Sequence, residues 1–206
     1  MPFDLDTLKK YSKECNITFK GVLHVGSHND AINKTYNSLN IHNNNIVWVE
    51  SDTVKAEYNK ANNLPNVFTT VIDELNSAIK YINKNNLDMQ PCNQSCCVEI
   101  PKLIITEINS FKIQPLNEFM EFNNFDPCEY NIWNFDCMGS EFRIFKGSKE
   151  LLKFADIIYT GVNSTEINKK NNRMSEIDKL LSEHGLKRIE TIKNEDNWCM
   201  AIYVRI

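Results

Sequence analysis

Two short apolar segments, about twenty residues apart, constrain the fold of this chain most strongly. The first, Gly21–His28, has the length of a buried strand and ends in a turn of small residues. The second, Ile46–Glu50, is a strand that ends in a carboxylate. In a βαβ unit the backbone approaches a nucleoside at the first turn, and an acid at the tip of the next strand accepts the ribose hydroxyls. The two segments therefore predict a nucleoside-binding half of an α/β sheet.

A third apolar strand, Asn131–Asp136, also ends in an acid and is followed by Gly139, Ser140 and Glu141. Ligands of open α/β sheets bind at the carboxyl ends of the strands. We therefore expect Asp136 to lie at the same edge of the sheet as Glu50.

The rest of the pattern alternates strands with helices. Strands are expected at 22–25, 46–50, 67–72, 131–136 and 156–162, and helices at 30–39, 53–62 and from 141 and 175 onward. Ser140 is expected to cap the first of these last two helices, and Ser175 to open the second as a capping box with Asp178. Residues 1–20 are expected to form an N-terminal helix or arm. Between 74 and 113 the pattern is weak, with a helix at 75–82 and strands at 102–108 and 110–113 as the interpretation.

The last two strands, 186–191 and 198–205, are separated only by a short polar loop and predict an antiparallel hairpin. The expected fold is a single α/β domain over residues 1–206, with a Rossmann-like, doubly wound, mostly parallel sheet that ends in this C-terminal hairpin. Dinucleotide dehydrogenases continue with parallel strands, whereas methyltransferases that use S-adenosylmethionine close with such a hairpin. The pattern thus favours the class I methyltransferase architecture.

Composition excludes several other classes of protein. The chain has 206 residues, enough for one domain with a core, and a formal net charge of -4 without a basic stripe for nucleic acid. No apolar run approaches the roughly 20 residues of a membrane span, and no secretory signal is visible, so we expect a cytoplasmic protein. Seven irregularly spaced cysteines indicate reduced thiols. The cluster Cys92, Cys96 and Cys97 lacks a matching second pair, so no metal site is predicted.

Taken together, the motifs resemble the FkbM-like S-adenosylmethionine-dependent methyltransferases. The resemblance covers residues 21–205 with a weak gap at 74–108, and it rests on these segments: Ile46–Glu50, Asn134–Glu141, Phe145–Gly147, Ile158–Asn163, Met174–Asp178, Glu183–Glu190, Trp198 and Ala201–Tyr203. It implies S-adenosylmethionine as cofactor and methyl transfer to an oxygen, commonly a hydroxyl of a sugar or glycan. The chain departs from the family pattern at Asp30 (usually glycine), Gly161 (usually an acid) and Met138 (often glutamine).

The residues expected to bind the cofactor follow the first three strands: Gly26, Ser27, His28, Glu50, Ser51 and Asp73. Gly26 and Ser27 let the backbone approach the methionine part, and Glu50 accepts the ribose hydroxyls. Asp73 either accepts from the adenine amino group or caps a helix.

The expected catalytic residues are Asp136, Glu141 and His28, with Asn163 to orient the substrate hydroxyl. An alcohol needs a base or a metal ion to become a nucleophile. Asp136 would take the proton directly, or hold a divalent ion beside Glu141, although no ligand set supports a metal. Glu141 has the alternative role of favouring the helix dipole, and His28 that of a local hydrogen bond.

Two rival functions differ in class. A catalytically degenerate methyltransferase fold would bind a nucleoside or a partner, and the departures at Asp30, Ala31 and Gly161 motivate it. A nicotinamide-dependent oxidoreductase is disfavoured because the Gly-x-Gly-x-x-Gly turn is missing. A homo-oligomer is left open.

Overall fold

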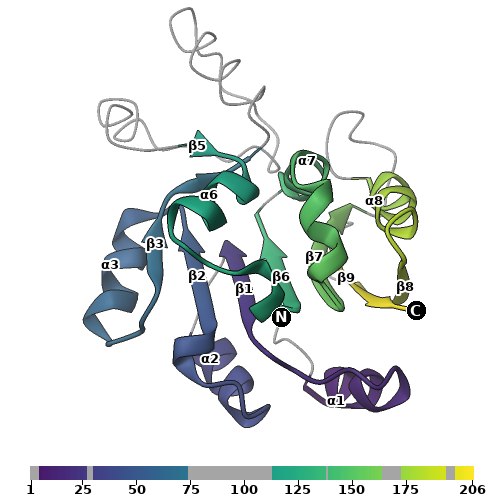
Figure 1. The fold of residues 1–206 in the computed structure, drawn as a ribbon, viewed down its shortest axis with the longest axis horizontal. Coiled ribbons are helices and arrows are strands. Elements are labelled where there is room, and N and C mark those ends of the chain that lie inside the picture. The colour runs from purple at the N-terminus through teal and green to yellow at the C-terminus, as the bar shows by residue number, and fades with distance from the viewer. Residues whose placement is uncertain (1–4, 27–29, 74–112, 138, 164–172, 194–197) are drawn as a thin grey trace, which may run out of the picture.

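The computed structural model describes residues 5–26, 30–73, 113–137, 139–163, 173–193 and 198–206. Its main feature is a seven-stranded sheet in the order β3-β2-β1-β6-β7-β9-β8 (Figure 1). These strands are β1 (Val22–Gly26), β2 (Ile46–Glu50), β3 (Val67–Thr69), β6 (Ile132–Asp136), β7 (Ile157–Asn163), β8 (Leu186–Lys193) and β9 (Trp198–Arg205). The five strands from β3 to β7 run parallel, and β9 lies antiparallel to both β7 and β8. A separate pair, β4 (Val71–Ile72) and β5 (Ile113–Gln114), forms a small parallel sheet.

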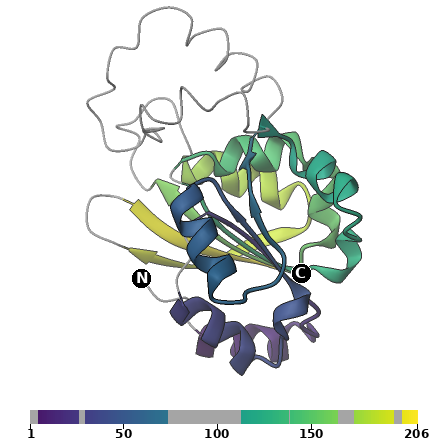
Figure 2. The same ribbon diagram turned by 90° about the vertical axis from the view of Figure 1, so that its left-hand side faces the viewer.

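Helices cover both faces of the main sheet (Figure 2). They are α1 (Leu5–Glu14), α2 (Asp30–Ser38), α3 (Thr53–Ala61), α6 (Leu116–Phe122), α7 (Glu141–Gly147) and α8 (Met174–Ser182). Short 3₁₀ segments lie at Asn43–Asn45, Pro127–Glu129 and Lys149–Phe154. Because side chains alternate along a strand, each face of the sheet buries its own apolar layer.

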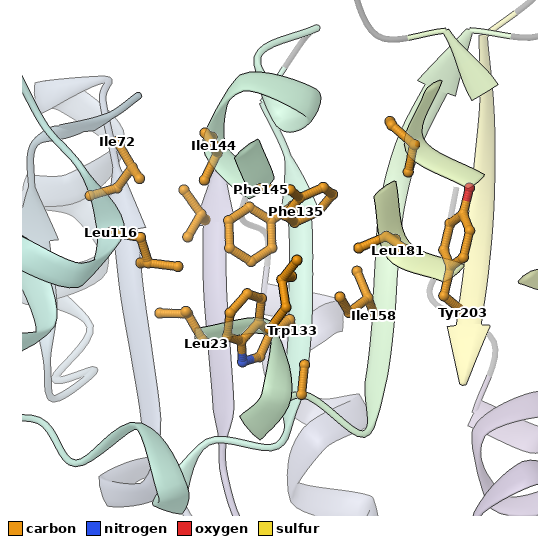
Figure 3. Close-up of a cluster of buried hydrophobic side chains, with 14 of the residues drawn as sticks. Leu23, Ile72, Leu116, Trp133, Phe135, Ile144, Phe145, Ile158, Leu181 and Tyr203 are labelled. Carbon is orange, nitrogen blue, oxygen red and sulfur yellow. The ribbon is translucent and has the colours of Figure 1, made fainter. Parts of the chain in front are cut away.

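The larger apolar layer lies between the sheet and α6, α7 and α8 (Figure 3). Leu23, Trp133 and Ile158 from neighbouring strands meet Phe145 and Leu181 from the helices there. The second layer, on the other face, packs α1 and α2 against the sheet through Leu8, Tyr36 and Leu39. With both faces covered, the parallel strands are mostly apolar.

The second layer contains a buried cluster of three polar side chains: His24, Tyr36 and Asn134. The Nδ1 atom of His24 lies 3.0 Å from the hydroxyl of Tyr36, which also accepts a hydrogen bond of 2.8 Å from the side-chain amide of Asn134. Burial raises the pKa of Tyr36, so the hydroxyl stays neutral. These three side chains connect β1, β6 and α2. His24 is thus a buried core residue whose Nδ1 atom lies at hydrogen-bond distance from the hydroxyl of Tyr36.

The sheet and its C-terminal hairpin confirm the predicted architecture. The expected strand 67–72 is broken at Thr70, after which β4 leaves the main sheet and pairs with β5. The predicted helix at 75–82 and the predicted strands at 102–108 and 110–112 lie outside the described residues.

Of the two predicted helix caps, Ser140 takes the predicted position before α7, and Ser175 does not take that before α8. Ser140 precedes α7, but its hydroxyl accepts from Arg143 Nη2 at 3.0 Å and makes no cap hydrogen bond. The helix α8 begins at Met174, so Ser175 lies inside it, and Arg173 occupies the cap position. Asp178 serves tertiary structure instead, because its carboxylate binds Arg188 at 2.8 and 3.0 Å.

Candidate functional site

The tips of β1 and β6 touch at the carboxyl edge of the sheet. Gly26 is paired with Asp136 in the parallel register and has a φ of +102°. A Cβ atom at Gly26 would lie 2.0 Å from the carbonyl oxygen of Asp136, so only glycine fits. This contact brings the predicted cofactor turn and the predicted catalytic acid to adjacent positions.

Glu50, at the tip of β2, is a buried carboxylate with one oxygen engaged. Its side chain is 5% exposed, and Oε1 accepts a hydrogen bond of 3.0 Å from the backbone N–H of Asp52. Its other oxygen, Oε2, has no hydrogen-bond partner among the described residues. A buried acceptor without a donor is costly, and so it marks a place where a ligand with a donor would bind well.

The charge of Glu50 is influenced by several neighbours. Burial raises the pKa of Glu50, while the backbone N–H groups of Asp52 and Ser51 and the ammonium of Lys55 lower it. Burial likewise raises the pKa of Asp136, and Lys55 opposes this shift too. Lys55 is therefore near enough to both acids to stabilise their negative charge.

Glu141 is fully buried and holds the turn that follows β6. Its Oε1 accepts a hydrogen bond of 2.7 Å from the backbone N–H of Cys137, and its Oε2 one of 2.9 Å from that of Gly139. Gly139 has a φ of +103°, which explains the glycine. Burial raises the pKa of Glu141 to about 8, although these hydrogen bonds favour the charged form. Both oxygens thus serve the backbone of the turn.

Cys137, directly after β6, carries a half-buried thiol whose charge the predicted acids influence. The Sγ atom of Cys137 lies 3.3 Å from the carbonyl oxygen of Val25, on β1. Burial raises the pKa of Cys137, and four carboxylates raise it further: Glu141, Asp136, Glu50 and Asp73. Glu141, Asp136, Glu50 and Asp73 are therefore all near enough to Cys137 to disfavour its thiolate.

Asp73, which follows β4, is 8% exposed and pairs with Arg143 of α7. The guanidinium Nε lies 3.0 Å from one carboxylate oxygen, and Nη2 lies 2.8 Å from the other. A two-pronged pair of this kind uses both oxygens and fixes their orientation. Arg143 also donates to Ser140, so the pair connects the end of β4 to the start of α7. No local pattern in the sequence indicates that Asp73 and Arg143 form a pair.

Asn163, predicted to bind substrate, is a buried residue at the end of β7, where it pairs with Trp198 of β9 and bridges to Arg173. Two residues earlier, a Cβ atom at Gly161 would lie 2.3 Å from Cζ2 of Trp198 and 3.1 Å from Oε1 of Glu141. The indole thus occupies the space next to the position where the resembled family carries an acid. The sequence analysis did not foresee this contact.

The remaining predicted site residues are Ser27, His28 and Ser51. Ser51 is half-buried and lies directly after β2. Ser27 and His28 lie outside the described residues. Gln114 and Thr70, which the sequence analysis did not select, are buried polar residues near the predicted site.

Within the described part of the chain, no group of three or more His, Cys, Asp or Glu side chains is arranged to hold a metal ion. Cys92, Cys96 and Cys97 lie outside that part. None of the helices described is both long and apolar enough to cross a bilayer.

The fold is that of the class I methyltransferases: five parallel strands, followed by a hairpin whose last strand is inserted antiparallel between β7 and β8. No protein-family model matches the sequence. No curated protein matches it either.

Solved structures with a similar fold include several methyltransferases. A putative caffeoyl-CoA O-methyltransferase from Staphylococcus aureus is 16% identical with a TM-score of 0.44, and the match covers 100% of this chain and 86% of that one. Magnesium protoporphyrin IX methyltransferase from Synechocystis PCC 6803 with bound SAH is 10% identical with a TM-score of 0.43 over 98% and 82%. A putative RNA methyltransferase from Pyrococcus horikoshii is 10% identical with a TM-score of 0.38 over 98% and 81%. At these values the likenesses carry no argument about ligand or activity.

Proposed function

We propose that this protein is an S-adenosylmethionine-dependent methyltransferase that binds its cofactor at the tips of β1 and β2. The observation that carries the proposal is the Oε2 atom of Glu50, a buried carboxylate oxygen without a donor among the described residues. Two adjacent ribose hydroxyls are donors of the kind that such an oxygen lacks. Gly26 supports the same site, because its positive φ turns the chain sharply at the tip of β1.

The acceptor proposed is a hydroxyl group of a sugar or glycan. S-adenosylmethionine, when bound, supplies a methyl group on a positively charged sulfur. In this proposal Asp136 accepts the proton that the hydroxyl loses, and its burial, which raises its pKa, makes it a better base than an exposed aspartate. Glu141 keeps the backbone after Asp136 in place through the N–H groups of Cys137 and Gly139.

Few catalytic side chains are needed for this reaction. Displacement at a methyl group depends mainly on the alignment of acceptor, methyl and leaving group. The contact of Gly26 with Asp136 fixes the two strand tips relative to one another. The choice of a sugar hydroxyl rests on the resemblance to the FkbM-like family.

Binding of S-adenosylhomocysteine, measured by isothermal titration calorimetry, tests the cofactor site. The wild-type protein should bind, and Glu50→Gln should lower the affinity at least about tenfold, because one ribose hydroxyl loses a charged acceptor. Glu57→Gln, on the exposed side of α3, is the matched control and should bind as wild type does. No heat of binding to the wild-type protein at millimolar ligand would contradict the proposal.

Asp136→Asn tests the role of the base. The amide does not accept a proton at neutral pH, so turnover of S-adenosylmethionine with a carbohydrate acceptor should fall about a hundredfold or more while cofactor affinity changes little. Release of S-adenosylhomocysteine is the measurement. Full activity in the variant would remove Asp136 from the mechanism and leave the cofactor site intact.

A second candidate function is binding of a nucleoside or a partner without catalysis. It is favoured by Trp198, whose indole lies against Gly161, where the resembled family has an acid. Binding of S-adenosylhomocysteine combined with no turnover over a broad set of acceptors would support this alternative.

A further inference from the structure

We propose that Gln114 reads the amino group of the adenine base and so makes the site selective for adenosine. This inference rests on the proposed cofactor site, since it names the residue that recognises the base of that cofactor. It starts from a second buried acceptor near the same edge of the sheet.

Gln114 is the last residue of β5 and is 4% exposed. Its side-chain Nε2 donates to the hydroxyl of Thr70 at 3.4 Å. Within the described part of the chain, its Oε1 atom has no hydrogen-bond donor. Buried side-chain amides normally satisfy both ends, so this oxygen is suited to a donor supplied by a ligand.

The backbone places this amide near Glu50. The N–H of Thr70 donates to the carbonyl oxygen of Glu50 at 3.2 Å, and the same residue holds the side chain of Gln114. On the other side, the N–H of Asp73 donates to the carbonyl oxygen of Gln114 at 3.2 Å. Gln114 thus lies between the tip of β2 and the acid that follows β4.

Asp73 is the other candidate for reading the base, but its carboxylate is already used. Both of its oxygens bind the guanidinium of Arg143, at 3.0 and 2.8 Å. Each oxygen of this mostly buried carboxylate therefore already has a donor. Gln114 is the better candidate, because its Oε1 atom has no donor among the described residues.

The chemistry of adenosine matches the two acceptors. The ribose offers hydroxyl donors, for Glu50 Oε2, and the base offers an exocyclic amino donor, for Gln114 Oε1. Side-chain amides recognise adenine through this amino group in other settings as well. Hypoxanthine carries a carbonyl oxygen at the same place, and two acceptor oxygens facing each other in a buried site repel.

The test compares S-adenosylhomocysteine with S-inosylhomocysteine, in which a carbonyl replaces the amino group and the adjacent N1 carries a hydrogen, by calorimetric titration. The wild-type protein should bind the adenine compound at least about tenfold more tightly. Gln114→Met, which is similar in length and has no amide, should bind both compounds with similar affinity. Thr70→Val, which removes the hydroxyl that orients the amide, should reduce the preference and serves if Gln114→Met does not fold. Glu50→Gln is the control and should weaken both compounds by the same factor.

The outcomes separate the two proposals. If neither compound binds the wild-type protein, the cofactor site itself is wrong. If S-adenosylhomocysteine binds but the wild type shows no preference, or if Gln114→Met and Thr70→Val keep the full preference, the role of Gln114 is overturned and the cofactor site stands.

Discussion

Glu50 and Glu141 are both buried acids at the carboxyl edge of the sheet, yet their hydrogen bonding differs. Glu50 uses one oxygen for the N–H of Asp52 and leaves the other without a partner among the described residues. Glu141 uses both oxygens for backbone N–H groups of the turn after β6. A buried acid at this edge is therefore not by itself a sign of ligand binding. An acid with one oxygen that lacks a donor is suited to bind a ligand, whereas an acid whose two oxygens both accept from backbone N–H groups stabilises the chain.

The largest effect expected from this contrast is on stability. Glu141→Ala leaves two N–H groups, those of Cys137 and Gly139, buried without an acceptor, and should lower the free energy of unfolding by about 3 kcal/mol. Glu50→Ala removes one such hydrogen bond, to Asp52, and should cost only about 1 kcal/mol. Urea unfolding of both variants measures the difference. Equal losses would show that Glu50 and Glu141 do not differ in their contribution to stability.

The burial of Glu141 also predicts a pH dependence of stability. The pKa of Glu141 is about 8 in the folded protein against 4.5 as the reference, so the folded state binds the proton more tightly. A raised acid pKa stabilises fully below the unfolded value, and this stabilisation is lost as the pH rises through the folded value. Between pH 4.5 and about 8, the free energy of unfolding of the wild-type protein should fall by a few kcal/mol relative to Glu141→Gln, at about 1.4 kcal/mol for each pH unit that separates the two pKa values.

Urea unfolding at a series of pH values checks this expectation. Glu141→Gln lacks the titrating group, so it serves as the reference at every pH. A wild-type curve parallel to that of the variant would show that Glu141 titrates in the folded protein as it does in the unfolded chain.

The smallest effect concerns the ion pair between Arg143 and Asp73. The guanidinium is one-third exposed, so solvent weakens the pair, and Arg143→Met should lower the free energy of unfolding by about 1 kcal/mol. Lys60→Met, which breaks the exposed pair with Glu57, is the matched control and should have no measurable effect. Thermal unfolding of both variants measures the two losses of stability. A loss as large as that of Glu141→Ala would place Arg143 among the groups that hold the turn.

The sequence was sufficient to predict the order of elements, because it depends on local pattern. Apolar strands such as Ile46–Glu50 and the C-terminal hairpin are visible in hydrophobic periodicity. The convergence of Glu50 and Asp136 follows from parallel strands that end at one edge. The order of the sheet also required the interpretation of the hairpin as the class I methyltransferase ending, which the structure confirms.

What the sequence did not predict depends on contacts between distant segments. Asp73 and Arg143 are 70 positions apart, and Thr70 and Gln114 are 44 apart, so no local pattern links them. The roles of Ser140 and Asp178 were misjudged for the same reason, since an arginine competes for each side chain. Whether an acid such as Glu141 faces a ligand or the backbone also depends on the path of the turn. Gly139 gives that turn its positive φ, and Gly161 leaves the space next to the carboxylate of Glu141.

The close approach of Gly26 to Asp136 has a consequence for how such a protein diversifies. The two strand tips are spaced by main chain against main chain, so exchanging side chains elsewhere does not alter the gap between them. Substitutions at other positions of this edge would therefore change the shape and charge around the two tips without changing the distance between Gly26 and Asp136.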